Sequence, residues 1–276
     1  MIHKHPPLLL ATLCCFILPL HSFSQSFFIQ SNAPYVHLED SLVLNHLQQD
    51  SLYAVTFHNR FLPALPPMTT RSASQNEFLG IDTVYKIPSN EWVYMSREGL
   101  VFFQEDTAGI TGKGIMVVSP DFPKYRQYED LIKPLRYLST NKEWNTLEIS
   151  GSPKTAFEQF WLKVGQTPDN ASELIRSFYR RVTYANETFS TYKEGWKTDM
   201  GMIYIVFGKP DRIEDNGTEI TWHYTNSPYR EKVDFLFIKR NNIFTEHHYQ
   251  LQRNKDYIKP WNEAIRQWRI GNPPLE

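Results

Sequence analysis

The chain has 276 residues, 41% of them hydrophobic, which is enough apolar side chain for the core of one large domain or two ordinary ones. Its 29 Lys and Arg residues nearly balance 30 Asp and Glu residues, and they form no cluster in either half. We therefore expect no nucleic-acid partner. Aromatic residues make up 14% of the chain, which favours β-rich structure and a surface that faces protein or carbohydrate.

Residues 1–24 have the layout of a secretory signal peptide. A basic start precedes an apolar run over 8–20, and Ser22 and Ser24 occupy the small positions of a cleavage site. The run is about 13 residues long, shorter than a membrane-spanning helix requires. We expect cleavage after Ser24 and no transmembrane segment in the mature chain.

Both cysteines, Cys14 and Cys15, lie inside this segment. Lipidation would need a small residue before the modified cysteine, but Leu13 or Cys14 stands there. The mature chain would then contain no cysteine, so we expect neither disulfides nor thiolate metal ligands.

The pattern of residues 25–125 predicts a β-rich domain. Short apolar or alternating runs are separated by Pro, Gly, Asn and Asp, without helical periodicity, which predicts an antiparallel sandwich-like domain. The expected strands cover 35–38, 41–47, 52–58, 83–87, 91–95, 99–104 and 114–118.

A tripeptide of Asp, a hydroxyl residue and an apolar residue recurs in this region. It occurs at 40–42, 50–52, 82–84 and 106–108. The pattern resembles an O-glycosylation site that some envelope-bearing bacteria use on exported proteins. It is also typical of turns that lead into strands. Both interpretations stay open.

Residues 126–276 change to helical periodicity and then to strands. Helices are expected over 129–148 with Pro134 interrupting, over 153–165 after an N-cap at Ser152, and over 168–189. Four strand-like runs follow at 202–207, 219–225, 233–239 and 245–252, and a helix at 261–270 ends the pattern. The sequence therefore predicts an α+β domain in which a four-stranded antiparallel meander lies between helices.

A turn at Gly195–Asp199, the motif turn, joins the last long helix to the first of these expected strands. Gly195 can adopt positive φ, and Thr198 and Asp199 can accept hydrogen bonds from nearby backbone N–H groups. Trp196 adds a large ring that fits a core better than a ligand platform. The candidate site is this turn, in a structural or binding role.

With these elements in place, the chain resembles the GWxTD-domain family of exported bacterial proteins. The motif turn carries the five-residue pattern after which the family is named, and the resemblance extends to segments 130–138, 177–186, 201–210 and 222–224. The resemblance implies an exported protein of unknown biochemical role and brings no catalytic or binding residues with it.

Few residues suggest chemistry. A Gly-x-Ser-x-Gly elbow and a P-loop are both absent from the sequence. Adjacent His247 and His248 would face opposite sides of a strand, which disfavours a shared metal. Glu194, Asp199 and His223 could form an acid–base set if the fold brought them together, although structural roles are favoured. We expect no catalytic residues, metal or cofactor.

The resulting hypothesis is an exported, non-enzymatic interaction or structural module of the bacterial cell envelope, periplasmic or associated with the outer membrane. Its partners would be other envelope proteins or glycans. The alternative is an envelope hydrolase that acts on glycan or peptide in an inter-domain cleft, using carboxylates such as Asp199 and Glu194.

Overall fold

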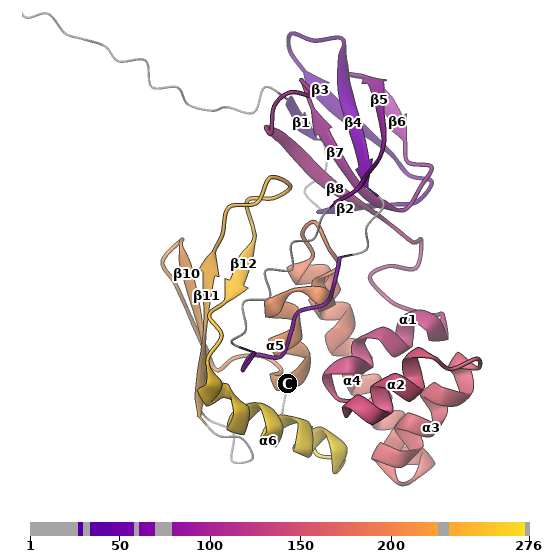
Figure 1. Cartoon of the computed structure of the whole chain (residues 1–276), viewed down its shortest axis with the longest axis vertical. Helices are drawn as coiled ribbons and strands as arrows, with labels where there is room; N and C mark the ends of the chain where they lie inside the picture. Colours follow the sequence, from indigo (N-terminus) through magenta and orange to yellow (C-terminus); the bar gives the residue numbers. More distant parts are fainter. Residues whose placement is uncertain (1–26, 30–33, 58–60, 70–78, 226–231, 274–276) are drawn as a thin grey trace, which may run out of the picture.

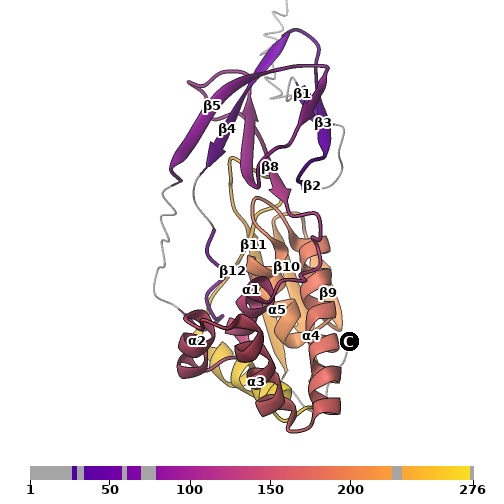
Figure 2. The same cartoon turned by 90° about the vertical axis from the view of Figure 1, so that its right-hand side faces the viewer.

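The computed structural model describes residues 27–29, 34–57, 61–69, 79–225 and 232–273 (Figure 1). The expected signal peptide lies outside these residues. A β-sandwich occupies one end of the long axis of the molecule and an α+β unit the other (Figures 1 and 2). The mixed α+β fold expected from the sequence is confirmed.

Two sheets form the sandwich. One has five strands in the order β2-β8-β7-β4-β5, and the other has three in the order β1-β3-β6. All pairs are antiparallel except β2 with β8, which is parallel. The strands are β1 (Phe27–Ile29), β2 (Tyr35–His37), β3 (Ser41–His46), β4 (Ser51–Phe57), β5 (Ile81–Pro88), β6 (Trp92–Tyr94), β7 (Gly99–Gln104) and β8 (Gly112–Val118).

Buried and more exposed side chains alternate along these strands, and the buried ones form the core between the two sheets. On β3, Leu42 and Leu44 are buried, while Val43 between them is half-buried. They pack against side chains of the larger sheet, among them Leu52, Ala54 and Phe103. Period-2 alternation of this kind is what makes one sheet face apolar.

The helical stretch expected over 129–148 consists of two short α-helices with a 3-10 turn between them. Helix α1 (Tyr128–Ile132) runs into a 3-10 turn, η1 (Lys133–Tyr137), which places Pro134 where its missing N–H does no harm. Thr140 and Glu143 then form a capping box that starts α2 (Asn141–Glu148). The long helices α3 (Pro153–Gly165) and α4 (Pro168–Phe189) begin with proline, as expected.

The prediction of a strand at 202–207 is wrong. These residues belong to helix α5 (Asp199–Phe207), which follows a 3-10 turn, η2 (Gly195–Lys197). Thr198 caps the helix, and Gly208 with φ of 80° ends it. All but one of residues 201–207 are buried, so the run has no polar face that would reveal its period.

The meander exists, but its first strand comes later than expected. Strands β9 (Arg212–Asp215), β10 (Glu219–Tyr224), β11 (Val233–Lys239) and β12 (Tyr249–Leu251) form an antiparallel sheet in the order β12-β11-β10-β9. Trp222, Tyr224, Phe235 and Phe237 are buried on the face that contributes to the main core. A third 3-10 turn, η3 (Lys255–Tyr257), leads into α6 (Ile258–Arg269).

Two segments cross between the units. The connection from β4 to β5 leaves the sandwich, and its described part, residues 61–69, lies against the α+β unit, where Ala64 and Met68 pack on the main core (Figure 1). We call it the strap. In the opposite direction, loop 240–248 between β11 and β12 reaches the sandwich, where Phe244 joins a cluster with Val55, Leu100 and Phe102.

Candidate functional site

The motif turn is held by side chains of the preceding helix. The N–H of Gly195 donates to Ser190 Oγ at 2.9 Å, and the N–H of Trp196 donates to Asn186 Oδ1 at 3.1 Å. Thr198 Oγ1 accepts the N–H of Gly201 at 3.0 Å, which is the N-cap of α5. The start of α5 is therefore fixed relative to the end of α4.

Two glycines allow this close packing. A Cβ on Gly195 would lie 1.8 Å from the carbonyl oxygen of Ala185, and one on Gly201 would lie 1.9 Å from the carbonyl oxygen of Gly195. Gly195 does not have the positive φ that the sequence suggested. Its role is to let the turn approach the backbone of α4.

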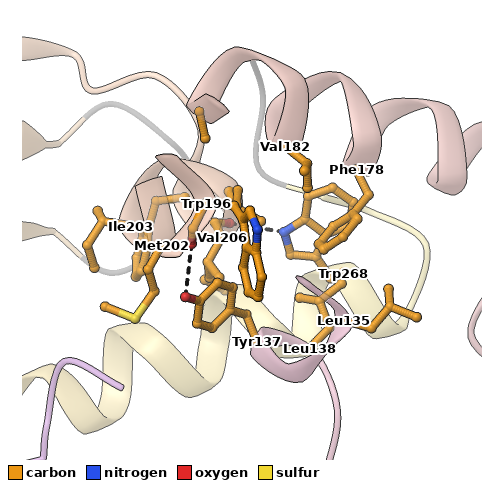
Figure 3. Packing of buried hydrophobic residues seen from close by; sticks show 14 of the residues in the cluster. Leu135, Tyr137, Leu138, Phe178, Val182, Trp196, Met202, Ile203, Val206 and Trp268 are labelled. Carbon is orange, nitrogen blue, oxygen red and sulfur yellow. Dashed lines mark hydrogen bonds between the residues drawn. The ribbon is translucent and has the colours of Figure 1, made fainter. Parts of the chain in front are cut away.

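Trp196 lies inside the main core with 1% of its surface exposed (Figure 3). Its ring contacts that of Tyr137 edge to face at 6.0 Å between centroids. The hydroxyl of Tyr137 donates to the carbonyl oxygen of Trp196 at 2.9 Å. Burial raises the pKa of Tyr137, so this hydroxyl stays protonated and remains a donor.

Asp199 at the start of α5 has a partner that the sequence did not suggest. Its carboxylate lies 2.5 Å from the guanidinium of Arg253 and accepts the N–H of Leu251 at 2.8 Å. The side chain is 9% exposed, so the pair is largely shielded from water. Asp199 therefore joins the motif turn to the end of β12.

Arg253 continues this chain of contacts to the strap, because its guanidinium donates to the carbonyl oxygen of Leu65 at 3.1 Å. Three more hydrogen bonds hold the strap. The N–H of Ala64 donates to Lys197 O, the N–H of Asn254 donates to Pro67 O, and Lys193 Nζ donates to Leu62 O. On the strap, these four hydrogen bonds all use backbone atoms. The motif turn and its neighbours thus form a docking site for an extended segment of the same chain.

An inter-unit cleft with a volume of about 1640 Å³ lies beside the motif turn. Both units line it, through residues 110–115 of the sandwich and residues 187–193, 198–200 and 239–251 of the α+β unit. His248 lies on its wall. Burial, with Lys193 as the next cause, lowers the pKa of His248, which favours the neutral imidazole. A molecule in this cleft would therefore meet residues of both units.

The acid–base set considered from the sequence is not assembled. Glu194 pairs with Lys197 at 2.5 Å, and Asp199 pairs with Arg253. His223 lies on β10, where it pairs with Asp234 of β11 at 2.7 Å. Among the described residues, no group of three His, Cys, Asp or Glu side chains is placed to hold a metal ion.

Sequence reasoning missed Arg253 and the strap. The pair Asp199–Arg253 spans 54 positions, and Arg253 and Leu65 are 188 positions apart, so no local spacing announces either contact. The available signal was the length of the irregular stretch between β4 and β5, since neighbouring antiparallel strands need only a short connection.

These features define a two-unit α+β protein in which a glycine–tryptophan turn joins the main core to the strap. The family model described as GWxTD domain matches residues 99–270, more than half of the chain, and the chain belongs to this family. The matched range begins at β7, so it includes two strands of the sandwich. No curated protein and no solved structure matches.

Within the described part of the chain, no helix has both the length and the apolar character that crossing a bilayer requires.

Proposed function

We propose that this chain is an exported, non-enzymatic interaction or structural module of the bacterial cell envelope. Its partner, an envelope protein or a glycan, would bind in the inter-unit cleft. The signal-peptide pattern supports export, and the two crossing segments support a rigid arrangement of the cleft walls. The motif turn would maintain that arrangement and would carry no reaction.

The observation that carries this proposal is the environment of Asp199. A general acid or base must exchange a proton with a substrate, whereas this carboxylate is shielded and bound to Arg253 and Leu251. The other carboxylate that a hydrolase could have used, Glu194, is paired with Lys197. Both carboxylates therefore form ion pairs with side chains of the same protein.

The test compares Asp199→Asn with Arg253→Gln and with the double variant. If the pair is structural, each single change should cost about 1–3 kcal/mol of stability. The double variant should cost less than their sum, because both changes remove the same interaction. The melting temperature and the cellular phenotype of each variant should change together.

A catalytic Asp199 gives a different result. Asp199→Asn would then leave the melting temperature near that of the wild type and abolish the phenotype, while a folded Arg253→Gln retained part of it. That outcome would contradict the structural role. Export is tested separately, by sequencing the N-terminus of the protein from the envelope fraction, where we expect the first residue to be Gln25.

A further inference from the structure

The charged residues that line the inter-unit cleft are mostly basic. Asp199 and Arg253 pair with each other, so their charges cancel. The other charged side chains of the lining, histidines aside, are four cations and two carboxylates: Lys113, Lys193, Lys239, Arg240, Glu187 and Glu246. Both units contribute, because Lys113 lies on β8 of the sandwich. The cleft therefore has an excess of positive charge in a chain whose formal net charge is −1.

Two of these cations lie close to His248, around the ring of Tyr192. The centroid of that ring lies 5.5 Å from the ring centroid of His248 and 5.7 Å from Lys193 Nζ. The N–H of Arg240 donates to the carbonyl oxygen of His248 at 2.8 Å. Burial is the main cause that lowers the pKa of His248, and Lys193 and Arg240 lower it further, against the opposite influence of Asp199. A carboxylate placed among these groups would relieve their mutual repulsion.

Three of the four cations are available to a ligand. Lys113, Lys239 and Arg240 form no ion pair with any other residue that the structure describes. The side chains of Lys239 and Arg240 are exposed, and that of Lys113 is half-buried. Their charges are therefore not neutralised by the fold.

The cleft also exposes branched aliphatic side chains from both units. Ile110, on the hairpin between β7 and β8, is 73% exposed, and Ile243 on loop 240–248 is 46% exposed. The four aromatic side chains of the lining are buried or half-buried: Phe189, Tyr192, Phe244 and Tyr249. A glycan would need exposed, flat aromatic faces to stack against its rings, whereas exposed isoleucines fit the apolar side chains of a peptide.

We propose that the partner in the inter-unit cleft is an acidic segment of a protein, whose carboxylates contact the cations and whose apolar side chains contact Ile110 and Ile243. This inference rests on the proposed function and narrows its partner to one class. The volume of about 1640 Å³ exceeds the roughly 300–1,000 Å³ of a small-molecule pocket, so it can hold a chain segment. Opposite charge favours encounter with such a segment and disfavours basic partners.

The test measures the binding of fluorescent peptides to the full chain from Gln25 by anisotropy. The acidic probe alternates glutamate with isoleucine, and in two further probes glutamine or lysine replaces glutamate. The acidic probe should bind most tightly and the lysine probe least, with a difference that narrows as salt is added. Failure of the acidic probe to bind, or equal binding of the acidic and neutral probes, would overturn the proposal.

Oligogalacturonate with the same number of carboxylates distinguishes a glycan from a protein partner. It has the charge of the acidic probe without aliphatic side chains, so it should bind more weakly than the peptide. Tighter binding of the oligogalacturonate would assign the cleft to an acidic glycan and overturn the protein partner.

Variants locate the binding in the cleft. Lys239→Gln combined with Arg240→Gln should weaken the acidic probe by about threefold to tenfold at low salt and leave the neutral probe unaffected. Lys255→Gln combined with Lys259→Gln, at exposed positions of η3 and α6 outside the cleft, makes the same change in net charge and should leave binding unchanged. Equal losses in the two double variants would overturn the proposal.

Ile110→Ser should also weaken the acidic probe by about threefold to tenfold, whereas Ile149→Ser, at the 81% exposed end of α2, should not. Unchanged binding by Ile110→Ser would contradict the apolar part of the contact. Nuclear magnetic resonance gives an independent readout, since the acidic probe should raise the pKa of His248 and the neutral probe should not. The proposed function fails on other measurements, the melting temperatures and phenotypes of the Asp199 and Arg253 variants, so the two failures are distinguishable.

Discussion

Trp196 shows how one residue of the motif turn contributes to the stability of the whole α+β unit. Its ring lies in the core with Tyr137, Val206 and Trp268, while its backbone holds both Asn186 and the Tyr137 hydroxyl (Figure 3). The side chain and the main chain of the same residue thus stabilise the join between α4 and α5.

We predict that Trp196→Ala lowers the free energy of unfolding by about 3–5 kcal/mol, because it leaves a large cavity in the core. Trp92→Ala, which removes the same ring from an exposed position, should change it by no more than about 0.5 kcal/mol. Chemical denaturation of both variants provides the measurement. Comparable losses in the two would show that burial of Trp196 is not what stabilises the turn.

Gly195→Ala should be the most damaging single-methyl change in the motif turn. The added Cβ would lie 1.8 Å from the carbonyl oxygen of Ala185, so either the turn or α4 must move. Gly151→Ala is the control, since a Cβ there would meet no atom within 4 Å. We expect little soluble Gly195→Ala protein and normal yield of Gly151→Ala. A Gly195→Ala protein as stable as wild type would contradict the close packing.

At the scale of elements, the sequence predicts most helices and strands because caps and alternation are local. It fails for α5, where nearly every side chain is buried and neither period is visible. The deciding signals are at the ends of that run, Thr198 as N-cap and Gly208 as terminator. Because Thr198 and Asp199 were interpreted as turn residues, Thr198 was not recognised as the N-cap of a helix that begins at Asp199.

Glu143 links three elements. It completes the capping box of α2, and its carboxylate binds Lys163 of α3 and Arg269 of α6 at 2.7 and 2.9 Å. Partial burial alone would raise the pKa of Glu143, but the hydrogen bonds from Arg269 and Lys163 lower it to about 2, from an ordinary value of 4.5. The stabilisation is therefore complete above pH 4.5 and is lost as the pH falls from 4.5 toward 2.

We predict that Glu143→Gln lowers the melting temperature at pH 7, by an amount that corresponds to on the order of 1 kcal/mol, and that the difference shrinks below pH 4.5. Glutamine at this position can still take part in the capping box, so the change mainly removes charge. Glu148→Gln, at the exposed end of the same helix, is the control. A difference that does not vary between pH 7 and pH 3 would contradict the role of the ion pairs.

At the scale of the whole molecule, the sequence divided the chain near residue 125 from a change of periodicity, and this division stays a prediction. The sequence could not reveal that the units exchange segments. Phe244 enters an aromatic cluster on the sandwich, with ring centroids 5.4 Å from Phe102 and 5.5 Å from Phe57. Contacts between residues so far apart in sequence leave no periodic trace.

Phe244→Ser should loosen the two units from each other. We expect faster protease cleavage between residues 119 and 127, while each unit retains its own core. Ile243→Ser is the control, because the neighbouring side chain is 46% exposed. Limited proteolysis followed by mass spectrometry of the fragments measures the effect, and equal cleavage rates in both variants would contradict the docking role of Phe244.

The four hydrogen bonds that hold the strap all use its backbone, and this affects how the segment can change during evolution or engineering. Its N–H and C=O groups at Leu62, Ala64, Leu65 and Pro67 are present whatever side chains the segment carries. Most of its side chains could therefore be replaced without losing these hydrogen bonds. A deletion of one residue, by contrast, would shift the carbonyl that Arg253 binds. These hydrogen bonds thus constrain the length of the strap more than its composition, whereas the packing of Phe61, Ala64 and Met68 constrains those three side chains.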